Sequence, residues 1–381
     1  MLSKEELKRY NRHIILPEFG MEAQEKLKRA KVLVIGAGGL GCPILQYLTA
    51  AGVGTLGIID FDHVEESNLQ RQVLFGLEDV GKLKAEVAAA KLARQNPFVK
   101  FEVHSFKLDR GNALDLLSKY DIVVDGSDNF PTRYLVSDAC TILKKPLIFG
   151  SIFKFEGQVS VFNYTSPSGE KSPTYRCLFP DPPSADAVPN CSTIGVLGVL
   201  PGMIGTIQAN EAIKVITGIG KPLAGRLMVL DALTMGSQII QITADQENLD
   251  ITSLQDNYEE ICQAPVTEPL DNASDFAEMS VTMLNEKLLK GEDIFLLDVR
   301  ESFEYQICHL PASVLIPMAH ITDQLDKIPR DKQVVIYCHH GMRSASVLKF
   351  LAREHRYKNL INLRSGIDDW ALQVDQNMER Y

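Results

Sequence analysis

Residues 31–60 read KVLVIGAGGLGCPILQYLTAAGVGTLGIID, and this stretch decides the fold. The opening run KVLVI predicts a short buried strand, GAGGLG at 36–41 a tight turn, and the residues from about Pro43 a helix. The run TLGIID then predicts a second strand that ends on Asp60. Strand, glycine-rich turn, helix and strand in this order are typical of a parallel α/β sheet that binds a phosphate at the helix N-terminus.

Helices and strands continue to alternate after Asp60. Residues 82–95 are rich in helix formers, and we expect further strands at 101–104, 121–125 and 146–149. This alternation predicts an α/β fold with a Rossmann-like doubly wound sheet. Beyond Gly150, GQVSVFN at 157–163 alternates with period two, which indicates an antiparallel extension of the sheet. The rest of this domain is expected to form a long proline-rich loop, a helix and two strands, at 163–190, 202–217, 226–231 and 237–243.

A second, smaller α/β domain is expected after a linker. Residues 246–275 are rich in acids, Asn and Gln and show no clear periodicity. Beyond them, strands are expected at 294–300, 334–338 and 361–363, and helices at 281–290 and 343–354. We therefore predict a first domain over 1–245, a linker over 246–275 and a second domain over 276–381.

Length, charge and cysteine content exclude several classes of protein. A chain of 381 residues exceeds what one hydrophobic core usually supports, and its net charge of −10 disfavours binding to nucleic acid. No apolar run approaches the roughly 18 residues of a membrane span, and the charged start lacks the apolar core of a signal peptide. The 7 cysteines are scattered, as in a protein with free thiols in a reducing cytosol. We therefore expect a cytoplasmic protein that binds neither nucleic acid nor membrane.

The glycine-rich turn is a candidate phosphate site. Gly36, Gly38, Gly39 and Gly41 have the GxGxxG spacing, which lets backbone N–H groups face a phosphate. Asp60 follows about 20 residues later, where a carboxylate can bond a ribose hydroxyl. Taken alone, this pattern indicates an NAD or FAD site.

Residues further along the chain favour a triphosphate instead. Asn68, Arg71 and Lys84 supply one amide and two cations close behind Asp60, and these suit a triphosphate whose charge is neutralised as pyrophosphate leaves. Asp128, in DGSDN, follows another predicted strand and is a candidate ligand for a magnesium ion that bridges phosphates. Any one of these residues alone would suit a solvated surface, but as a set at strand ends they favour ATP.

Several motifs of the first domain occur together in one known family. RYNRHIILPEFG, GAGGLGCP, DFDHVEESNLQRQ, GSDN and GVLGVLPG, over about residues 5–245, resemble the E1-like activating enzymes of molybdopterin and thiamin synthesis. The resemblance implies adenylation of the C-terminal glycine of a small ubiquitin-like sulfur carrier protein. Arg12 resembles the arginine that crosses a dimer interface to the partner's ATP, which implies an obligate homodimer. The implied contacts to ribose, phosphates and magnesium come from Asp60, Asn68, Arg71, Lys84, Asp128 and Asn129, with Asp128 as the magnesium ligand.

One departure from that family concerns zinc. Its members commonly carry two CxxC pairs that bind a structural zinc ion. Here the first pair is replaced by Thr174-Tyr175-Arg176-Cys177, and the second is absent from residues 240–265. We therefore predict no zinc, and expect packing or the linker to stabilise this region.

The second domain contains a candidate sulfur-carrying cysteine. Cys338 opens CHHGMRS directly after a predicted strand, so loop N–H groups and a helix N-terminus would favour a thiolate or persulfide anion. Arg343 adds positive charge to this loop. The spacing also suits a phosphatase-type anion loop, but LLDVRESFEY, HLPASVLIP and SGIDDW, within about 278–375, resemble a single-domain rhodanese. This resemblance implies that Cys338 carries transferable sulfur as a persulfide.

A second cysteine and two alternative functions complete the hypothesis. Cys191 ends the proline-rich loop, at the place of the cysteine that the E1-like family is proposed to use in acyl transfer. The expected reactions are ATP- and magnesium-dependent adenylation, then sulfur transfer from Cys338 with help from Cys191. The sulfur donor would be a cysteine desulfurase or thiosulfate. An NAD-dependent oxidoreductase with a rhodanese-like docking module, and a non-catalytic scaffold, remain alternatives at this stage.

Overall fold

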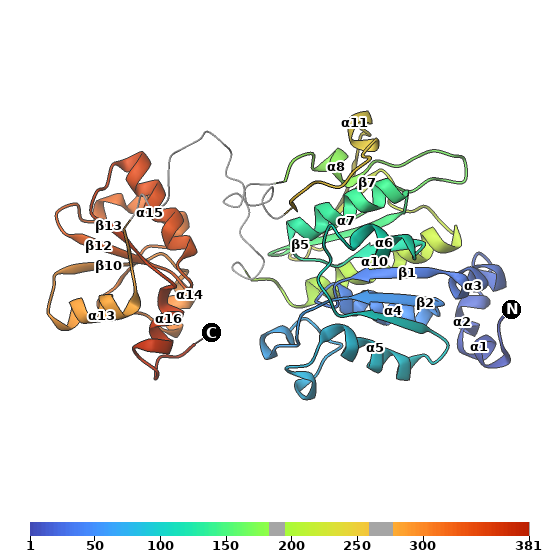
Figure 1. The fold of residues 1–381 in the computed structure, drawn as a ribbon, viewed down its shortest axis with the longest axis horizontal. Coiled ribbons are helices and arrows are strands. Elements are labelled where there is room, and N and C mark those ends of the chain that lie inside the picture. Colours follow the sequence, from blue (N-terminus) through green and yellow to red (C-terminus); the bar gives the residue numbers. More distant parts are fainter. Residues whose placement is uncertain (183–194, 259–276, 381) are drawn as a thin grey trace. The chain divides into compact units, whose positions relative to one another are not determined.

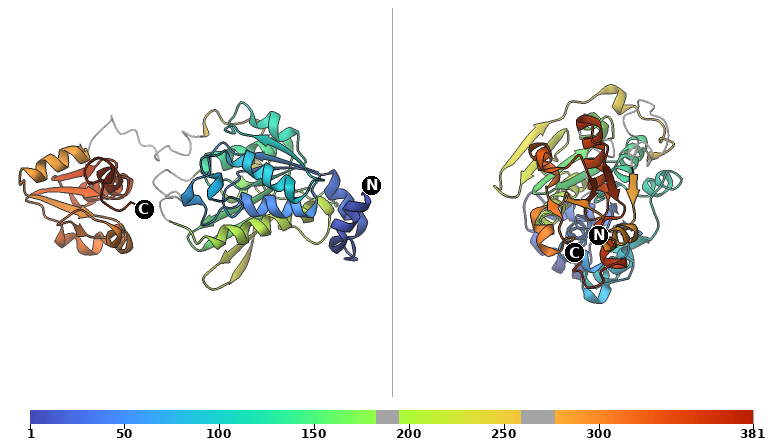
Figure 2. Two further views of the ribbon diagram at one scale, coloured as in Figure 1. Left: turned by 90° about the horizontal axis from the view of Figure 1, so that it is seen from below. Right: turned by 90° about the vertical axis from the view of Figure 1, so that its left-hand side faces the viewer.

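The computed structural model describes residues 1–182, 195–258 and 277–380. The chain divides into two compact units, Met1–Val266 and Thr267–Tyr381. Figures 1 and 2 show that each unit is built around its own sheet, with helices on both faces. Within the described residues, no helix is long and apolar enough to cross a membrane.

The first unit contains an eight-stranded sheet in the order β3-β2-β1-β4-β5-β6-β7-β8. Its first five strands are parallel and the other pairings are antiparallel. The predicted doubly wound sheet with an antiparallel extension is therefore confirmed. The strands are β1 Lys31–Ile35, β2 Thr55–Ile59, β3 Lys100–His104, β4 Ile122–Asp125, β5 Leu147–Phe153, β6 Glu156–Phe162, β7 Arg226–Asp231 and β8 Ser237–Gln241. The hairpin of β7 and β8 forms the edge of the sheet (Figure 2).

Helices bury both faces of this sheet. The α-helices of the first unit are α1 Lys4–Arg9, α2 Asn11–Ile14, α3 Gly20–Arg29, α4 Gly41–Ala51, α5 Lys84–Gln95, α6 Ala113–Ser118, α7 Phe130–Leu143, α8 Tyr175–Leu178, α10 Val199–Thr217 and α11 Gln246–Leu249. Two short 3-10 helices lie at Glu66–Asn68 and Leu77–Asp79. In Figure 1, α4 and α5 lie on the opposite side of β1 and β2 from α6 and α7.

Strand β1 shows why the central strands are apolar on both faces. Val32 and Val34 pack into the core that contains the side chains of α3, α4, α5 and α10. Leu33 and Ile35 point the other way, into the core that contains those of α6 and α7. Because successive side chains of a strand face opposite sides, a strand covered on both faces becomes a continuous apolar run. This explains the apolar run KVLVI at residues 31–35.

The first unit extends further along the chain than the predicted boundary. We expected an aperiodic linker from residue 246, but α11 lies there, and Leu254 and Tyr258 are buried in the core beside α6 and α7. The Tyr258 hydroxyl donates to Oδ2 of Asp138 at 2.8 Å. These isolated apolar contacts have no periodicity along the sequence, so pattern analysis misses them. The described part of the predicted loop over 163–190 likewise contains the short helix α8.

The second unit contains a five-stranded parallel sheet in the order β11-β10-β12-β13-β9. Its strands are β9 Ala277–Met279, β10 Ile294–Asp298, β11 Val314–Leu315, β12 Gln333–Tyr337 and β13 Leu360–Leu363. The helices are α13 Val281–Leu289, α14 Ser302–Ile307, α15 Met342–His355 and α16 Gly366–Gln373, with short 3-10 segments at Met318–His320 and Thr322–Lys327. Side chains of β12 alternate between two cores, which confirms a smaller α/β domain with helices on both faces.

Candidate functional sites

The glycine-rich turn joins β1 to α4 in a conformation that requires glycine. Gly36 has a φ of 85°, and its N–H donates to the carbonyl oxygen of Ile59 at 2.8 Å. A Cβ atom on Gly41 would lie 2.1 Å from the carbonyl oxygen of Gly36. Larger residues would therefore open the turn. Gly36, Gly38 and Gly39 line a cavity, whereas Gly41 lies outside the residues that line it and packs against the turn.

Asp60 holds the glycine-rich turn at the end of β2. Its carboxylate accepts the N–H of Ala37 at 2.7 Å and the N–H of Asp62 at 2.8 Å. Burial raises the pKa of Asp60, while these two N–H groups and the Lys84 ammonium oppose the rise. A carboxylate offers about four acceptor positions, so Asp60 retains the capacity to accept a ribose hydroxyl.

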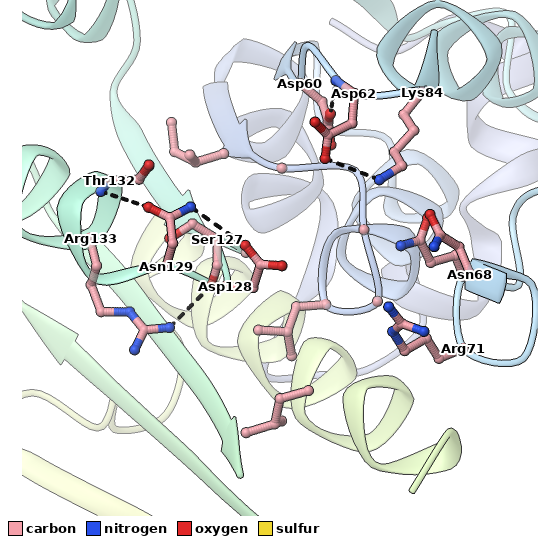
Figure 3. Close-up of a pocket in the computed structure, with 18 of the residues that line it drawn as sticks. Asp60, Asp62, Asn68, Arg71, Lys84, Ser127, Asp128, Asn129, Thr132 and Arg133 are labelled. Atoms are coloured by element: carbon pink, nitrogen blue, oxygen red, sulfur yellow. Dashed lines mark hydrogen bonds and ion pairs between the residues drawn. The ribbon is translucent and has the colours of Figure 1, made fainter. Parts of the chain in front are cut away.

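Three of the predicted phosphate-binding residues line the same cavity as the glycine-rich turn. Lys84 starts α5, is buried, and lies 3.3 Å from Oδ2 of Asp62. Asn68 is buried in the short helix that precedes Arg71, and Nη1 of Arg71 donates to the carbonyl oxygen of Ser67 at 3.2 Å. Figure 3 shows Asn68, Arg71 and Lys84 along one side of the cavity. The cavity volume is about 560 Å³.

The opposite side of the cavity is formed by the turn after β4. Asp128 and Asn129 are exposed there, and Figure 3 shows them across from Lys84 and Arg71. The Asn129 side chain caps α7 by accepting the N–H of Thr132 at 3.0 Å. Its amide nitrogen lies 3.5 Å from Oδ1 of Asp128. The fold thus brings together two sets of polar groups, at residues 60–84 and 128–129, because the carboxyl ends of parallel strands meet at one edge.

The residues of the cavity fit a magnesium ion that is bound together with a nucleotide. Within the described residues, no group of three or more His, Cys, Asp or Glu side chains could hold a metal by itself. Magnesium usually keeps several waters and takes only one or two carboxylates plus phosphate oxygens. The exposed carboxylate of Asp128, on the cavity wall, meets this need.

Arg133 also lines the cavity, and the sequence patterns did not single it out. It is buried on α7, and its guanidinium donates to the carbonyl oxygen of Ser127 at 3.1 Å. A signal was present: Asp125 ends a fully apolar strand, and such a buried carboxylate requires a nearby cation. Arg12, by contrast, is exposed on α2 and is not among the residues that line the cavity of its own chain.

A second candidate site surrounds Cys338 at the end of β12. The cysteine is buried, and its Sγ accepts the N–H of Gly341 at 3.1 Å. The hydroxyl of Ser344 lies 3.6 Å from the same sulfur and 2.7 Å from Oδ1 of Asn362. Gly341 has a φ of 90° as it enters α15. The loop therefore directs the N–H of Gly341 at the sulfur, and the hydroxyl of Ser344 is close enough to turn toward a sulfur anion.

The loop around Cys338 carries less net positive charge than the sequence suggested. The guanidinium of Arg343 binds the Glu304 carboxylate through two nitrogens, each at 2.7 Å. Arg343 thus joins the loop to α14, and its positive charge is largely offset by the carboxylate. Burial, together with the neighbouring His340, lowers the pKa of His339 to about 4, so His339 is neutral at pH 7.

Residues 174–177, where the E1-like resemblance places the first cysteine pair, are joined by hydrogen bonds to residues 245–248. The N–H of Asp245 donates to the sulfur of Cys177 at 3.4 Å, and the hydroxyl of Thr174 donates to the carbonyl oxygen of Asn248 at 3.0 Å. Next to them, Arg176 binds Asp138 through two nitrogens, at 2.7 and 2.9 Å. These contacts give this region a source of stability other than a metal. The absence of zinc remains a prediction.

Of the remaining cysteines, Cys308 is half-buried beside Arg300, and the other four fall into two groups. Cys191 and Cys262 lie outside the described residues. Cys42 and Cys140 are buried, and burial raises the pKa of Cys42 to about 12 and that of Cys140 further. Thiols that stay protonated in an apolar core are poor nucleophiles.

Comparisons with known proteins identify the families of the two units. The ThiF family matches residues 10–251, and the rhodanese-like domain matches residues 280–373. The chain therefore belongs to the ThiF family and carries a C-terminal rhodanese-like domain, so the predicted resemblance to an E1-like enzyme fused to a rhodanese is confirmed.

Relatives with the same two-part organisation extend over the whole chain. The probable adenylyltransferase/sulfurtransferase MoeZ of Mycobacterium tuberculosis is 44% identical over 382 residues, covering 100% of this chain and 96% of the relative. The adenylyltransferase and sulfurtransferase MOCS3 of Drosophila grimshawi is 40% identical over 396 residues, covering 100% and 87%. The crystal structure of E. coli MccB with MccA-N7isoASN has a TM-score of 0.56 at 22% identity, covering 66% of this chain and 75% of that one, which shows a shared fold.

Proposed function

We propose that the chain adenylates the C-terminal glycine of a small ubiquitin-like sulfur carrier protein and then transfers sulfur from Cys338 to the activated glycine. The observation that carries the first half is the shared cavity, which brings the glycine-rich turn and Asp60 together with Lys84, Arg71 and Asp128. The full-length relatives named adenylyltransferase and sulfurtransferase support both halves. The chain is thus an enzyme that combines the two activities.

Adenylation needs little beyond orientation and charge stabilisation. An oxygen of the glycine carboxylate attacks the α-phosphorus of ATP, and pyrophosphate leaves. A carboxylate is already ionised at neutral pH, so no general base is required. Lys84 and Arg71 would stabilise the charge that develops on the phosphates, and Asp60 would hold the ribose. Magnesium, held by Asp128 when bound, would neutralise phosphate charge.

Sulfur transfer would follow at the activated glycine. The outer sulfur of a Cys338 persulfide attacks the acyl carbon, AMP leaves, and an acyl disulfide forms. The thiolate of Cys191 could then attack the Cys338 sulfur and release the thiocarboxylate, and a cellular thiol reductant would reduce the resulting disulfide. The N–H of Gly341, and the hydroxyl of Ser344 once it turns from Asn362 to the sulfur, suit the persulfide anion. A cysteine desulfurase or thiosulfate would supply the sulfur.

The first experiment separates the two activities in the intact chain. Carrier-dependent ATP–pyrophosphate exchange should be abolished in Asp128→Ala, because the magnesium ion that neutralises the phosphate charge then loses its protein ligand. The exchange should be retained in Cys338→Ala. Thiocarboxylate formation should be lost in both variants. Mass spectrometry of the carrier should show that the reaction of the Cys338→Ala variant stops at the carrier adenylate.

Three outcomes would contradict this function. Exchange that does not require a carrier would exclude the proposed substrate. Sulfur transfer that survives Cys338→Ala would favour the alternative in which the second unit is only a docking module. NAD-dependent dehydrogenase activity without pyrophosphate exchange would instead support the oxidoreductase alternative.

A further inference from the structure

Arg133 is a buried cation in the wall of the nucleotide cavity. It lies on α7, one turn after the capping residue Asn129, and only 7% of its surface is exposed. Its guanidinium carbon lies 5.7 Å from the ring centre of Phe130 and 5.2 Å from that of Phe149. A cation near two aromatic rings in a buried wall has a restricted orientation.

The guanidinium joins three segments that meet at the cavity. It donates to the carbonyl oxygen of Ser127 at 3.1 Å and to the hydroxyl oxygen of Ser151, on β5, at 3.4 Å. Its Nε lies 3.7 Å from Oδ2 of Asp125, the last residue of β4. Because the donors of an arginine project in fixed directions within one plane, these contacts set the position of the turn over 126–129 relative to both strands.

Asp125 also holds the turn over 126–129, through its side chain. The residue is fully buried, and its Oδ1 accepts the N–H of Ser127 at 2.9 Å. Its Oδ2 has no hydrogen-bond partner, so the nearby guanidinium compensates that oxygen by charge. A buried carboxylate without such compensation is strongly unfavourable. Loss of the cation would therefore disturb the residue that holds the Ser127 backbone.

We propose that Arg133 is a positioning residue for adenylation, which holds the turn over 126–129 so that the Asp128 carboxylate faces the nucleotide. This inference rests on the proposed magnesium-binding role of Asp128. Arg133 acts through the carbonyl oxygen of Ser127 and the carboxylate of Asp125. Its effect is therefore expected on the metal-dependent part of nucleotide binding, even before any carrier is present.

The test compares ATP binding to the full chain and to Arg133→Lys, with and without magnesium. Lysine keeps the charge but cannot point donors in three fixed directions. Calorimetry should show that the gain in ATP affinity on adding magnesium falls roughly tenfold, as for other residues that orient a metal ligand. ATP affinity in EDTA should stay nearly constant, and the amide hydrogen of Ser127 should exchange faster in the free protein.

A matched control separates positioning from general stability. Arg176→Lys alters another buried arginine that binds an acid on α7, Asp138, away from the cavity. It should lower the unfolding temperature without changing the magnesium-dependent gain. If Arg133→Lys does not fold, Ser151→Ala removes one of the three contacts and should give a smaller change of the same kind.

The outcomes distinguish this inference from the function on which it rests. If Asp128→Asn removes the magnesium-dependent gain but Arg133→Lys keeps it, the positioning role is wrong and the magnesium role stands. If Asp128→Asn also keeps the gain, the proposed magnesium ligand itself is wrong. If the magnesium-dependent gain in ATP affinity decreases equally in Arg133→Lys and Arg176→Lys, Arg133 only stabilises the fold.

Discussion

Lys84 is a buried lysine whose ammonium has an exposed partner. The residue is buried at the start of α5, and its ammonium lies 3.3 Å from the largely exposed carboxylate of Asp62. An ion pair with one exposed partner contributes little to stability, while a cation in a cavity wall is well placed to stabilise phosphate charge. The surroundings of Lys84 therefore indicate a role in binding more than in folding.

Lys84→Met should consequently impair adenylation without unfolding the protein. We expect pyrophosphate exchange to fall by about a hundredfold or more, the size typical for a lost charge-stabilising group. The unfolding temperature should change little, because methionine preserves most of the buried stem. The exposed Lys82, two residues earlier, is the matched control, and the Lys82→Met variant should catalyse pyrophosphate exchange at the normal rate. Equal rates for the two variants would exclude Lys84 from the phosphate site.

Among the elements, α7 connects the nucleotide cavity with the end of the first unit. Its first turn carries Asn129 and Arg133 at the cavity. Further along, the buried Asp138 accepts hydrogen bonds from Arg176 and from the hydroxyl of Tyr258. Helix α7 thus contacts both the nucleotide cavity, through Asn129 and Arg133, and the residues around Tyr258, which we expected to belong to a linker.

The contact of Tyr258 gives a stability prediction for this helix. Tyr258→Phe removes one hydrogen bond to a buried carboxylate, so the free energy of unfolding of the first unit should fall by roughly 1.5–3 kcal/mol. Urea denaturation of the full chain, followed by a signal from the first unit, measures this change. Tyr47→Phe, at a half-exposed position on α4, should have almost no effect. A Tyr258→Phe variant as stable as Tyr47→Phe would mean that the hydrogen bond from Tyr258 to Asp138 does not stabilise the first unit.

The elements also show which features the sequence can predict. Strands β1, β2 and β4 were predictable because burial on both faces makes them continuous apolar runs. Asp60 and Lys84 were predictable because a loop motif and strand ends bring polar groups to one edge. Arg133 and Tyr258 were not, since the hydrogen bonds and the ion pair that place these two residues follow no motif or period along the sequence. The pairing of Arg343 with Glu304 was missed for the same reason.

At the scale of the whole molecule, we propose that a second subunit completes the adenylation site. Arg12 is exposed on α2 and does not line the cavity of its own chain. The resemblance to E1-like enzymes assigns it to the ATP of a partner subunit. If that role is correct, every active site contains Asp128 of one subunit and an arginine of the other, and a monomer is inactive.

Mixing two inactive variants tests this arrangement directly. Arg12→Ala and Asp128→Ala should each abolish pyrophosphate exchange as homodimers. In a mixed dimer, the Arg12→Ala chain keeps its own Asp128 and receives the intact arginine of its partner, so one of the two sites is restored. Random exchange of subunits should therefore recover about a quarter of the normal activity, since half of the dimers are mixed and each has one site. A mixture that stays inactive although mass spectrometry detects mixed dimers would place Arg12 and Asp128 in the same chain's site, and an active Arg12→Ala homodimer would place Arg12 outside it.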